Sequence, residues 1–205
     1  ADRPLKIGSF SAASNVTGLK TDVEEVAALL HQYDALSFWD YAAAAPYVSI
    51  DMNPVDSACS KDAVFLSPHK FVGGPGTPGV LIVKKKLLKN SVPASPGGGT
   101  VLYVTPVDHQ FITDHERREE GGTPAIVESI RAGLAFKLQQ AVGTELIESL
   151  EANFKERALR RWKTNKNIEV LGDSSQEGLS IFSLRIKHEG ADLHYGFVVA
   201  LLNDL

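Results

Sequence analysis

Short apolar runs alternate with a helical stretch in the first half of the chain, and this alternation restricts the possible folds more than any other feature. Apolar runs at residues 5–11, 35–39 and 63–66 predict strands. Between the first two, apolar residues recur at helical spacing from Thr21, the expected N-cap, to about Asp34. Because consecutive parallel strands need a crossover connection, the sequence predicts an α/β fold with a mostly parallel sheet.

The middle of the chain predicts further strands and a long helix. Residues 80–84 predict a strand returning from a glycine-rich loop, residues 101–104 predict a short strand, and residues 107–114 look irregular. A helix is expected to begin near Pro124, with Thr123 as its cap. Its apolar side chains fall on one face that we expect to be buried, at Ile126, Ile130, Leu134 and Leu138.

The sequence pattern changes in the last third of the chain, and this change predicts a second structural unit. A helix is expected after Gly143. Two strands and a last helix should follow it, at residues 167–171, 179–186 and 193–205. We place a domain boundary within residues 142–148, so that residues 1–142 form one unit and residues 143–205 an incomplete small α+β unit.

We expect both ends of the chain to be cuts within a longer sequence. Ala1 is not an initiator methionine, and the residues after it lack the basic and then apolar profile of a signal peptide. The apolar periodicity of the last residues reaches Leu205 without a stop signal. We therefore expect an internal fragment of a longer protein.

Composition excludes several classes of function. No apolar run approaches the roughly 18 residues that a membrane span needs. A formal charge of −4 and a pI near 5.9 give no overall attraction for nucleic acid. The single cysteine, Cys59, excludes an intrachain disulfide and a multi-cysteine zinc site, which favours a reducing intracellular compartment, the cytoplasm.

The main candidate for chemistry is Lys70, in the run Ser67-Pro68-His69-Lys70 at the end of an apolar strand. A lysine amine is a nucleophile only when unprotonated, so a site that uses it lowers its pKa or holds it as an imine with a carbonyl cofactor. From spacing alone, a surface lysine that opens a turn is an equally good interpretation. The functional interpretation of Lys70 therefore depends on the residues expected near it.

Asp40, which ends another expected strand, is the first such neighbour. A carboxylate against the ring nitrogen of a pyridoxal cofactor keeps that nitrogen protonated. The alternative is an aspartate that caps the following turn. Ser67 and His69 offer a hydroxyl and an imidazole to a phosphate, and Thr123 could bind an anion at a helix start.

Other binding patterns are weak. The glycines of residues 71–79 match neither a Walker A nor a GxGxxG pattern. A phosphate-binding module built on this loop is therefore less favoured than an enzyme that uses Lys70 or a non-catalytic folding unit. A tight turn explains these glycines. His109 and His115 share a segment but have no paired metal-ligand spacing, so no metal site is expected.

Four motifs in order resemble the class V aminotransferase family, whose best-known branch is the cysteine desulfurases. They are Ser14-Asn15-Val16-Thr17-Gly18, Trp39-Asp40-Tyr41-Ala42-Ala43, Ser67-Pro68-His69-Lys70 and Glu120-Gly121-Gly122-Thr123-Pro124. The resemblance covers most of residues 5–135. It implies a pyridoxal phosphate (PLP) enzyme of fold type I, with residues 1–142 as the C-terminal part of the cofactor-binding large domain.

The resemblance also implies roles for single residues. Lys70 would be the Schiff-base lysine and Asp40 the partner of the pyridinium nitrogen. Ser67 and His69 would be phosphate ligands, and Asn15 would lie near the phenolic oxygen of the cofactor or the substrate carboxylate. Thr123 matches a residue that reaches the phosphate of the neighbouring subunit, which implies a homodimer with shared sites and an amino acid as substrate.

Departures from the family pattern limit this transfer. Ala43 stands where desulfurases usually carry a glutamine, and Cys59 does not match the cysteine that carries the persulfide in that branch. The phosphate loop and the stacking ring of the family precede the part that this chain matches. We therefore expect PLP to bind the chain weakly or not at all, and a non-catalytic folding or dimerisation unit is the alternative reading.

Overall fold

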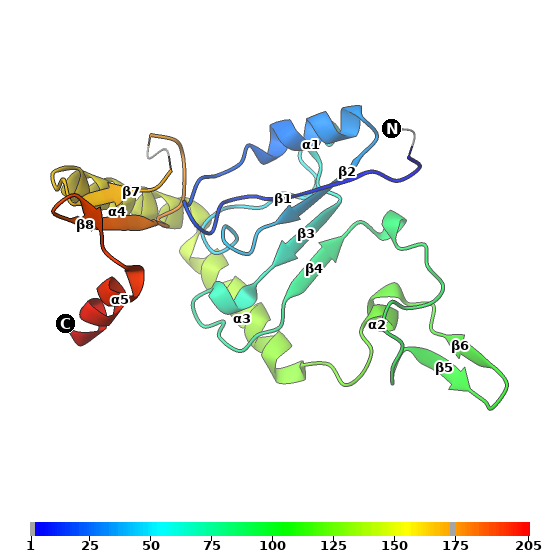
Figure 1. Ribbon diagram of the computed structural model, residues 1–205. Coiled ribbons are helices and arrows are strands. Elements are labelled where there is room, and N and C mark those ends of the chain that lie inside the picture. Colours follow the sequence, from blue (N-terminus) through cyan, green and yellow to red (C-terminus); the bar gives the residue numbers. More distant parts are fainter. Residues whose placement is uncertain (1–2, 173–174) are drawn as a thin grey trace.

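The computed structural model describes residues 3–172 and 175–205, and the strands of this part form three separate sheets (Figure 1). The largest sheet has the order β1-β2-β3-β4. Its strands are β1 Ile7–Ser11, β2 Leu36–Asp40, β3 Ala63–Leu66 and β4 Val80–Val83. The first three run parallel and β4 is antiparallel to β3. The predicted α/β fold with a mostly parallel sheet is confirmed.

Strand β4 runs antiparallel because the loop before it turns the chain directly back. Leu66 at the end of β3 pairs with Val80 at the start of β4. Residues 71–79 therefore form the tight connection predicted from their glycines. A parallel crossover would usually have carried an α-helix, and this connection contains only a 3-10 turn.

Helix α1, Val23–Gln32, makes the crossover between β1 and β2. Its N-cap is Asp22, whose carboxylate accepts a hydrogen bond from the backbone N–H of Glu25 at 2.9 Å. The predicted cap, Thr21, is wrong by one residue, because its hydroxyl donates to the carbonyl of Ser11 at 2.8 Å instead. That bond ties the helix start to the end of β1.

The core lies between the large sheet, the segment after β2 and one face of α3, Ile126–Val142. Trp39 and Val64, on neighbouring strands, are completely buried. The indole N–H of Trp39 donates to Ser37 Oγ at 2.6 Å, so the buried ring leaves no polar atom without a partner. The other buried members of the cluster are Ala12, Ala13, Tyr41, Ala44, Ala45, Phe71, Ala135 and Leu179.

Beyond β4 and the 3-10 turn Lys85–Leu87, the chain forms an arm that extends away from the sheet (Figure 1). It contains the antiparallel pair β5 Val101–Val104 and β6 His109–Phe111, followed by the short helix α2 His115–Glu119. The prediction of an irregular segment at residues 107–114 is wrong for residues 109–111, which form β6, and correct for the other five. Cross-strand bonds with β5 stabilise β6, although its sequence lacks a strong strand pattern.

Helix α3, Ile126–Val142, starts later than predicted. Its N-cap is Ala125, without a side-chain bond, so Thr123 does not cap it. The backbone N–H of Gly122 donates to the carbonyl of Gly98 at 2.9 Å. This bond holds the preceding segment against the arm and delays the first helical turn.

The apolar stripe of α3 is exposed, which contradicts the prediction. Ile126, Ile130 and Leu134 are 60–61% exposed. The helix instead buries the small side chains Ala132 and Ala135, because close approach to the core leaves no room for larger ones. The exposed residues continue at a spacing of four into the next helix, and we call the whole set the apolar row: Ile126, Ile130, Leu134, Leu138, Val142, Leu146, Leu150 and Phe154.

Helix α4, Thr144–Lys163, follows α3 after the single residue Gly143. Gly143 has φ 88°, which favours glycine, and it lies within the predicted domain boundary. The boundary itself stays a prediction. Leu159 of α4 is buried, and Trp162 packs edge-on against Phe182 at 4.9 Å between ring centroids.

The last part contains an antiparallel sheet and a terminal helix. The strands are β7 Ile168–Val170, β8 Leu184–His188 and β9 Ala191–Asp192, and α5 spans Tyr195–Asp204. The predicted strand at residues 179–186 starts too early. Leu179 N–H donates to the carbonyl of Gly18 at 2.8 Å, so this segment pairs with the turn after β1 and not with β7.

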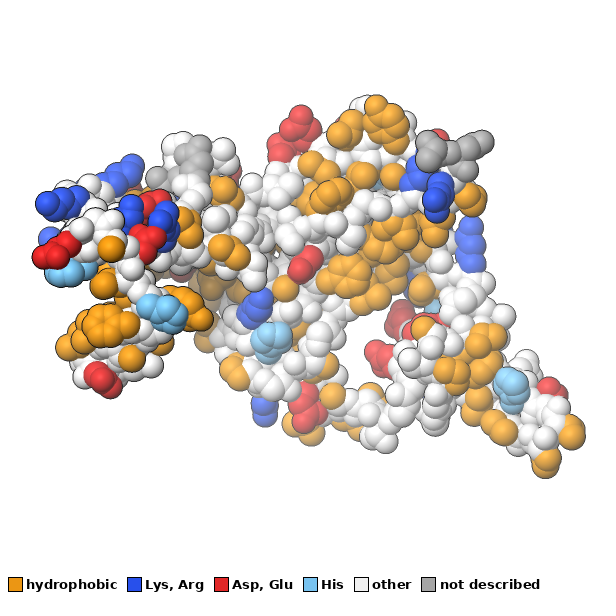
Figure 2. All heavy atoms as spheres, in the orientation of Figure 1, with side chains coloured by type: hydrophobic (Ala, Val, Ile, Leu, Met, Phe, Trp, Pro, Cys, Tyr) orange, Lys and Arg blue, Asp and Glu red, His pale blue; other side chains and the backbone are white. Residues whose placement is uncertain are grey.

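Hydrophobic side chains remain exposed over the strands of the large sheet and over α5 (Figure 2). The accessible surface is 13929 Å² for a mass of 22.1 kDa. A compact monomer of this mass exposes about 9300 Å². In the part of the chain that is described, no helix has the length and apolar character to cross a membrane.

Candidate active site

The carboxyl ends of β1, β2 and β3 meet at one edge of the parallel sheet. They end at Ser11, Asp40 and Leu66. Asp40 pairs with Ser11 on one side and with Phe65 on the other. In open α/β sheets ligands bind outside this edge, so the residues that follow these strands form the candidate site.

Asp40 is held firmly at this edge. Its carbonyl accepts a hydrogen bond from the N–H of Ala12 at 2.9 Å, and the next residue, Tyr41, donates to the carbonyl of Phe65 at 2.9 Å. Its Oδ1 accepts the N–H of Ala42 at 2.7 Å, which is the capping role considered above. Asp40 is exposed, and among the described residues no donor bonds to Oδ2. One oxygen thus fixes the carboxylate while the other can face a ligand.

Lys70 ends a 3-10 turn, Pro68–Lys70, that follows β3 directly. Its N–H donates to the carbonyl of Ser67 at 3.0 Å, while its side chain is exposed. Ser67 is half-buried and its hydroxyl makes no capping bond, and His69 is exposed. The structure therefore presents a hydroxyl, an imidazole and an amine from one short turn.

The loop after Lys70 is tightly bonded to this turn. Gly74 N–H donates to the carbonyl of Phe71 at 2.9 Å, and Thr77 donates to the carbonyl of Gly74 through both its N–H at 3.1 Å and its hydroxyl at 2.7 Å. A Cβ on Gly74 would lie 1.9 Å from the carbonyl oxygen of Pro68. Only glycine permits this approach.

Helix α3 supports the same turn from the other side. The rings of Phe71 and Phe136 meet edge-on with centroids 5.1 Å apart. Arg131 donates from Nη1 to the carbonyl of Pro75 at 2.9 Å. Sequence reasoning did not find these positioning contacts, because nothing local marks partners more than fifty residues apart.

Asn15 lies in the turn that follows β1, at the same edge of the sheet. The hydroxyl of Ser14 accepts bonds from the N–H groups of Val16 at 3.2 Å and Thr17 at 3.1 Å, which fixes the turn. Asn15 is exposed. The structure therefore places Asn15, Asp40 and Lys70 at one edge of the sheet, at or just after the ends of three neighbouring parallel strands.

Thr123 lies apart from this group. It is exposed in the segment between α2 and α3, across β4 from the parallel strands. Its neighbours Gly122 and Pro124 border a cavity of about 500 Å³ that is also lined by Gly79 and Val80. Within one chain, Thr123 therefore borders the far side of the glycine-rich loop and not the turn of Lys70.

A buried tyrosine adjoins the site. Burial, and to a smaller extent the charge of Glu24, raises the pKa of Tyr41 to about 12. Its phenol therefore stays neutral at physiological pH. The described residues include no group of three or more His, Cys, Asp or Glu side chains suited to a metal ion.

A second charged network, which sequence reasoning missed, lies at the opposite end of β3. The side chain of Asp62 is 2% exposed, and its Oδ2 accepts from Ser37 N–H at 3.0 Å and lies 3.1 Å from His31 Nε2. Its Oδ1 lies 3.6 Å from Lys84 Nζ. Burial raises the pKa of Asp62, but these hydrogen bonds and the lysine charge outweigh that effect and lower it overall. This network stabilises the sheet and is remote from Lys70.

The residues at the candidate site fit part of a PLP-binding site. An exposed carboxylate ends β2 and an exposed amine lies in the turn after the neighbouring strand β3, an arrangement that suits a pyridine nitrogen and an aldehyde. Ser67 and His69 can bond to phosphate oxygens. The mostly parallel sheet is that of part of a large domain of PLP fold type I.

The sequence model described as Aminotransferase class-V matches residues 2–198, and the chain belongs to this family. A probable cysteine desulfurase of Halalkalibacterium halodurans is 31% identical over 183 residues, which are 89% of this chain and 44% of the relative. A cysteine desulfurase of Shigella sonnei is 28% identical over 203 residues, or 97% and 48%. The chain spans about half the length of these curated relatives.

Solved structures show the same fold. A cysteine desulfurase of Escherichia coli, in its S-sulfonic acid form, superposes with a TM-score of 0.82 at 22% identity, covering 97% of this chain and 47% of the other. The protein C-DES, solved with glycine covalently linked to its PLP cofactor, gives a TM-score of 0.79 at 17% identity, with 97% and 51% covered. At these identities the likeness establishes the fold.

Proposed function

We propose that the chain is the lysine-bearing part of a PLP-dependent enzyme that acts on an amino acid by desulfuration or transamination, through a Schiff base at Lys70. The observation that carries this proposal is the position of Asp40 and Lys70 after neighbouring parallel strands, at one edge of the sheet. The family and the fold support it. An intracellular location is part of the same proposal.

Each residue has a chemical task in this proposal. PLP, when bound, supplies an electron sink for carbanion chemistry at the substrate. Lys70 would hold the aldehyde carbon through its amine and, when free, would move protons at the substrate Cα. Asp40 would hold the pyridinium N–H through Oδ2, since its Oδ1 is occupied by Ala42. Ser67 and His69 would donate to the phosphate, and Asn15 would orient the phenolic oxygen or the substrate carboxylate.

Thr123 supports a homodimer in the same proposal. It is exposed and lies away from Lys70 in its own chain, so it is free to reach the site of a second subunit. Ala43 stands where desulfurases usually carry a glutamine, so the phenolic oxygen of the cofactor would lack that hydrogen-bond donor. Experiment must therefore distinguish desulfuration from transamination.

The exposed apolar row favours a second reading, in which the chain alone is a non-catalytic folding or dimerisation unit. The two readings differ in what happens to added PLP. The first requires a covalent adduct at one lysine, whereas the second requires none.

The decisive measurement is the absorbance of the imine band in the longest natural form of the protein with added PLP. Borohydride reduction and peptide mass mapping then locate the adduct. We expect the adduct on Lys70, loss of the band in Lys70→Ala, and retention of the band in Lys89→Ala, a matched change at another exposed lysine. A band that persists without Lys70 would refute the assignment.

A further inference from the structure

The second half of α4 and the three residues after it form a strongly basic surface segment. It carries six cations and a single carboxylate, Glu156, in a protein of net charge −4. The cations are Lys155, Arg157, Arg160, Arg161, Lys163 and Lys166. Lys and Arg side chains gather visibly at the end of the molecule that carries α4 (Figure 2).

Most of these cations lack a partner among the described residues. Arg160 lies 3.8 Å from Glu156, and Lys155 donates to the carbonyl of Gln176 at 3.0 Å. Arg157 and Arg161 are exposed and have no described carboxylate within 4.0 Å. The acids of the adjoining sheet, Glu169 and Asp192, are already paired with cations of β8.

The helix dipole accounts for only part of this charge. Cations in the last turn of a helix offset the partial negative charge of its carbonyl end, which explains Arg160, Arg161 and Lys163. Arg157 lies one turn earlier, where the dipole effect has faded. A charge that stays unpaired outside the last turn is available to a ligand.

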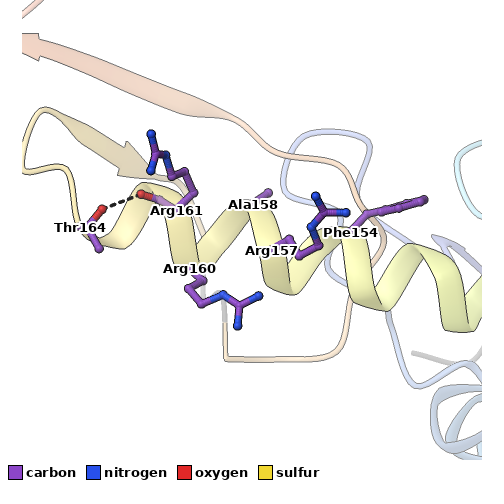
Figure 3. Close-up of a pocket in the computed structure, with 6 residues that line it drawn as sticks. All are labelled: Phe154, Arg157, Ala158, Arg160, Arg161 and Thr164. Carbon is purple, nitrogen blue, oxygen red and sulfur yellow. Dashed lines mark hydrogen bonds between the residues drawn. The ribbon is translucent and has the colours of Figure 1, made fainter.

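The exposed side of this helix combines the charge with an aromatic ring. Phe154, Arg157, Arg161 and Thr164 recur at spacings of three or four and share one face. They line a shallow hollow of about 720 Å³ together with Ala158 and Arg160. Figure 3 shows the three guanidinium groups fanning out in different directions from α4 with the ring of Phe154 beside Arg157. Phe154 is 50% exposed.

We propose that this face, from Phe154 to Thr164, binds an acidic polypeptide segment of a protein partner, with an apolar side chain of the segment against Phe154. Arginine and aromatic side chains are enriched in the centres of protein interfaces and dominate their binding energy. Guanidinium groups bind carboxylates in a bidentate manner. The net negative charge of the rest of the chain opposes a long polyanion such as nucleic acid more than a short acidic peptide.

The test measures fluorescence anisotropy of a labelled, glutamate-rich peptide with a central Phe-Leu pair, titrated with the chain. A glutamine version of the peptide and a single-stranded oligonucleotide of equal charge are the comparison probes. We expect the glutamate peptide to bind, to weaken with salt, and to weaken about tenfold in the triple variant Arg157→Glu, Arg160→Glu, Arg161→Glu. Phe154→Ala should also weaken binding at unchanged salt dependence.

The matched control reverses three exposed cations elsewhere, Lys89→Glu, Arg117→Glu and Lys137→Glu, and should change the affinity less than twofold. If the triple reversal disturbs folding, the glutamine variant of the same three arginines replaces it. Equal loss in the control, absence of peptide binding, or tighter binding of the oligonucleotide would each overturn the proposal. None of these outcomes depends on Lys70 or on PLP.

Discussion

Among the described residues, Asp62 is the one carboxylate that is buried, and its environment illustrates how one residue contributes to stability. Ser37 N–H, His31 and Lys84 surround it. A buried carboxylate is stable only when such donors replace the water it has lost. Because its pKa is lowered on folding, the charged form is favoured in the folded state.

This network predicts a pH-dependent loss of stability. The contribution of Asp62 is fully present above its unfolded pKa, about 3.9, and is lost as pH falls through the lower folded pKa. We expect Asp62→Asn to reduce the free energy of unfolding by about 1–3 kcal/mol at neutral pH and by less below about pH 4. Urea unfolding across pH measures both values.

Asp204→Asn, at an exposed position of the last helix, is the matched control and should have little effect at any pH. A difference between Asp62→Asn and the original protein that stayed constant down to pH 2 would contradict this account.

The residues of the candidate site were predictable to different degrees. Asp40 and Lys70 were found because strand ends in α/β sheets are visible in the sequence, and the structure places both at the expected edge. Arg131 and Phe136 could not be found, because their contacts with the turn of Lys70 depend on how α3 packs. The roles of all these residues stay predictions.

At the scale of elements, the loop after Lys70 is the best example of a local sequence that dictates its conformation. Gly74 folds back over the 3-10 turn and is fixed by Phe71 and Thr77. The turn that carries Lys70 is therefore rigid on the loop side and supported by α3 on the other. Rigid support is what a residue that must meet a cofactor needs.

Gly74→Ala should disrupt this loop. The added Cβ would lie 1.9 Å from the backbone oxygen of Pro68, which cannot move like a flexible side chain. We expect a loss of at least about 2 kcal/mol in the free energy of unfolding. Gly98→Ala is the matched control, since nothing lies within 4 Å of its added Cβ, and thermal unfolding compares the two. Equal melting temperatures would refute the proposed fit.

Elements with strong local signals were predicted well. Strand β3 has the predicted bounds, because a short apolar run between polar residues has few alternatives. Strand β6 was missed because its sequence lacks a strong strand pattern, although it pairs with β5 across a short hairpin. Strand β8 was placed too early because Leu179 bonds to Gly18, a partner far away in the sequence. The stripe of α3 has the predicted period, but its burial depends on what packs against it.

At the scale of the whole molecule, the surface is far from that of a compact monomer. Large side chains that face outward along α3 and α4 contribute to the excess over about 9300 Å², together with those over the large sheet and α5. Exposed apolar surface of this kind favours association. Because the chain spans about half of its relatives, the part of the row on α3 is a candidate surface for the remainder of the family fold.

The apolar row predicts that the chain alone associates. Sedimentation velocity should show concentration-dependent oligomers at micromolar concentration, and Ile130→Glu with Leu134→Glu should shift the protein toward the monomer. Lys137→Glu with Gln140→Glu changes exposed polar residues of the same helix and should leave the oligomers in place. A compact monomer at every concentration would exclude this behaviour.

Gly143 is the only residue between α3 and α4, so a backbone rotation at Gly143 would move the whole of α4. Twenty residues of helix span about 30 Å, so a rotation of about 10° at Gly143 would displace the far end by about 5 Å. The ion pair of Lys20 with Glu148 joins α4 directly to the segment after β1 and resists such a rotation. Lys20 also pairs with Glu177, and Leu179 bonds to Gly18, so the segment before β8 is tied to the same turn. A rotation of α4 would therefore strain the segment after β1, which carries Asn15.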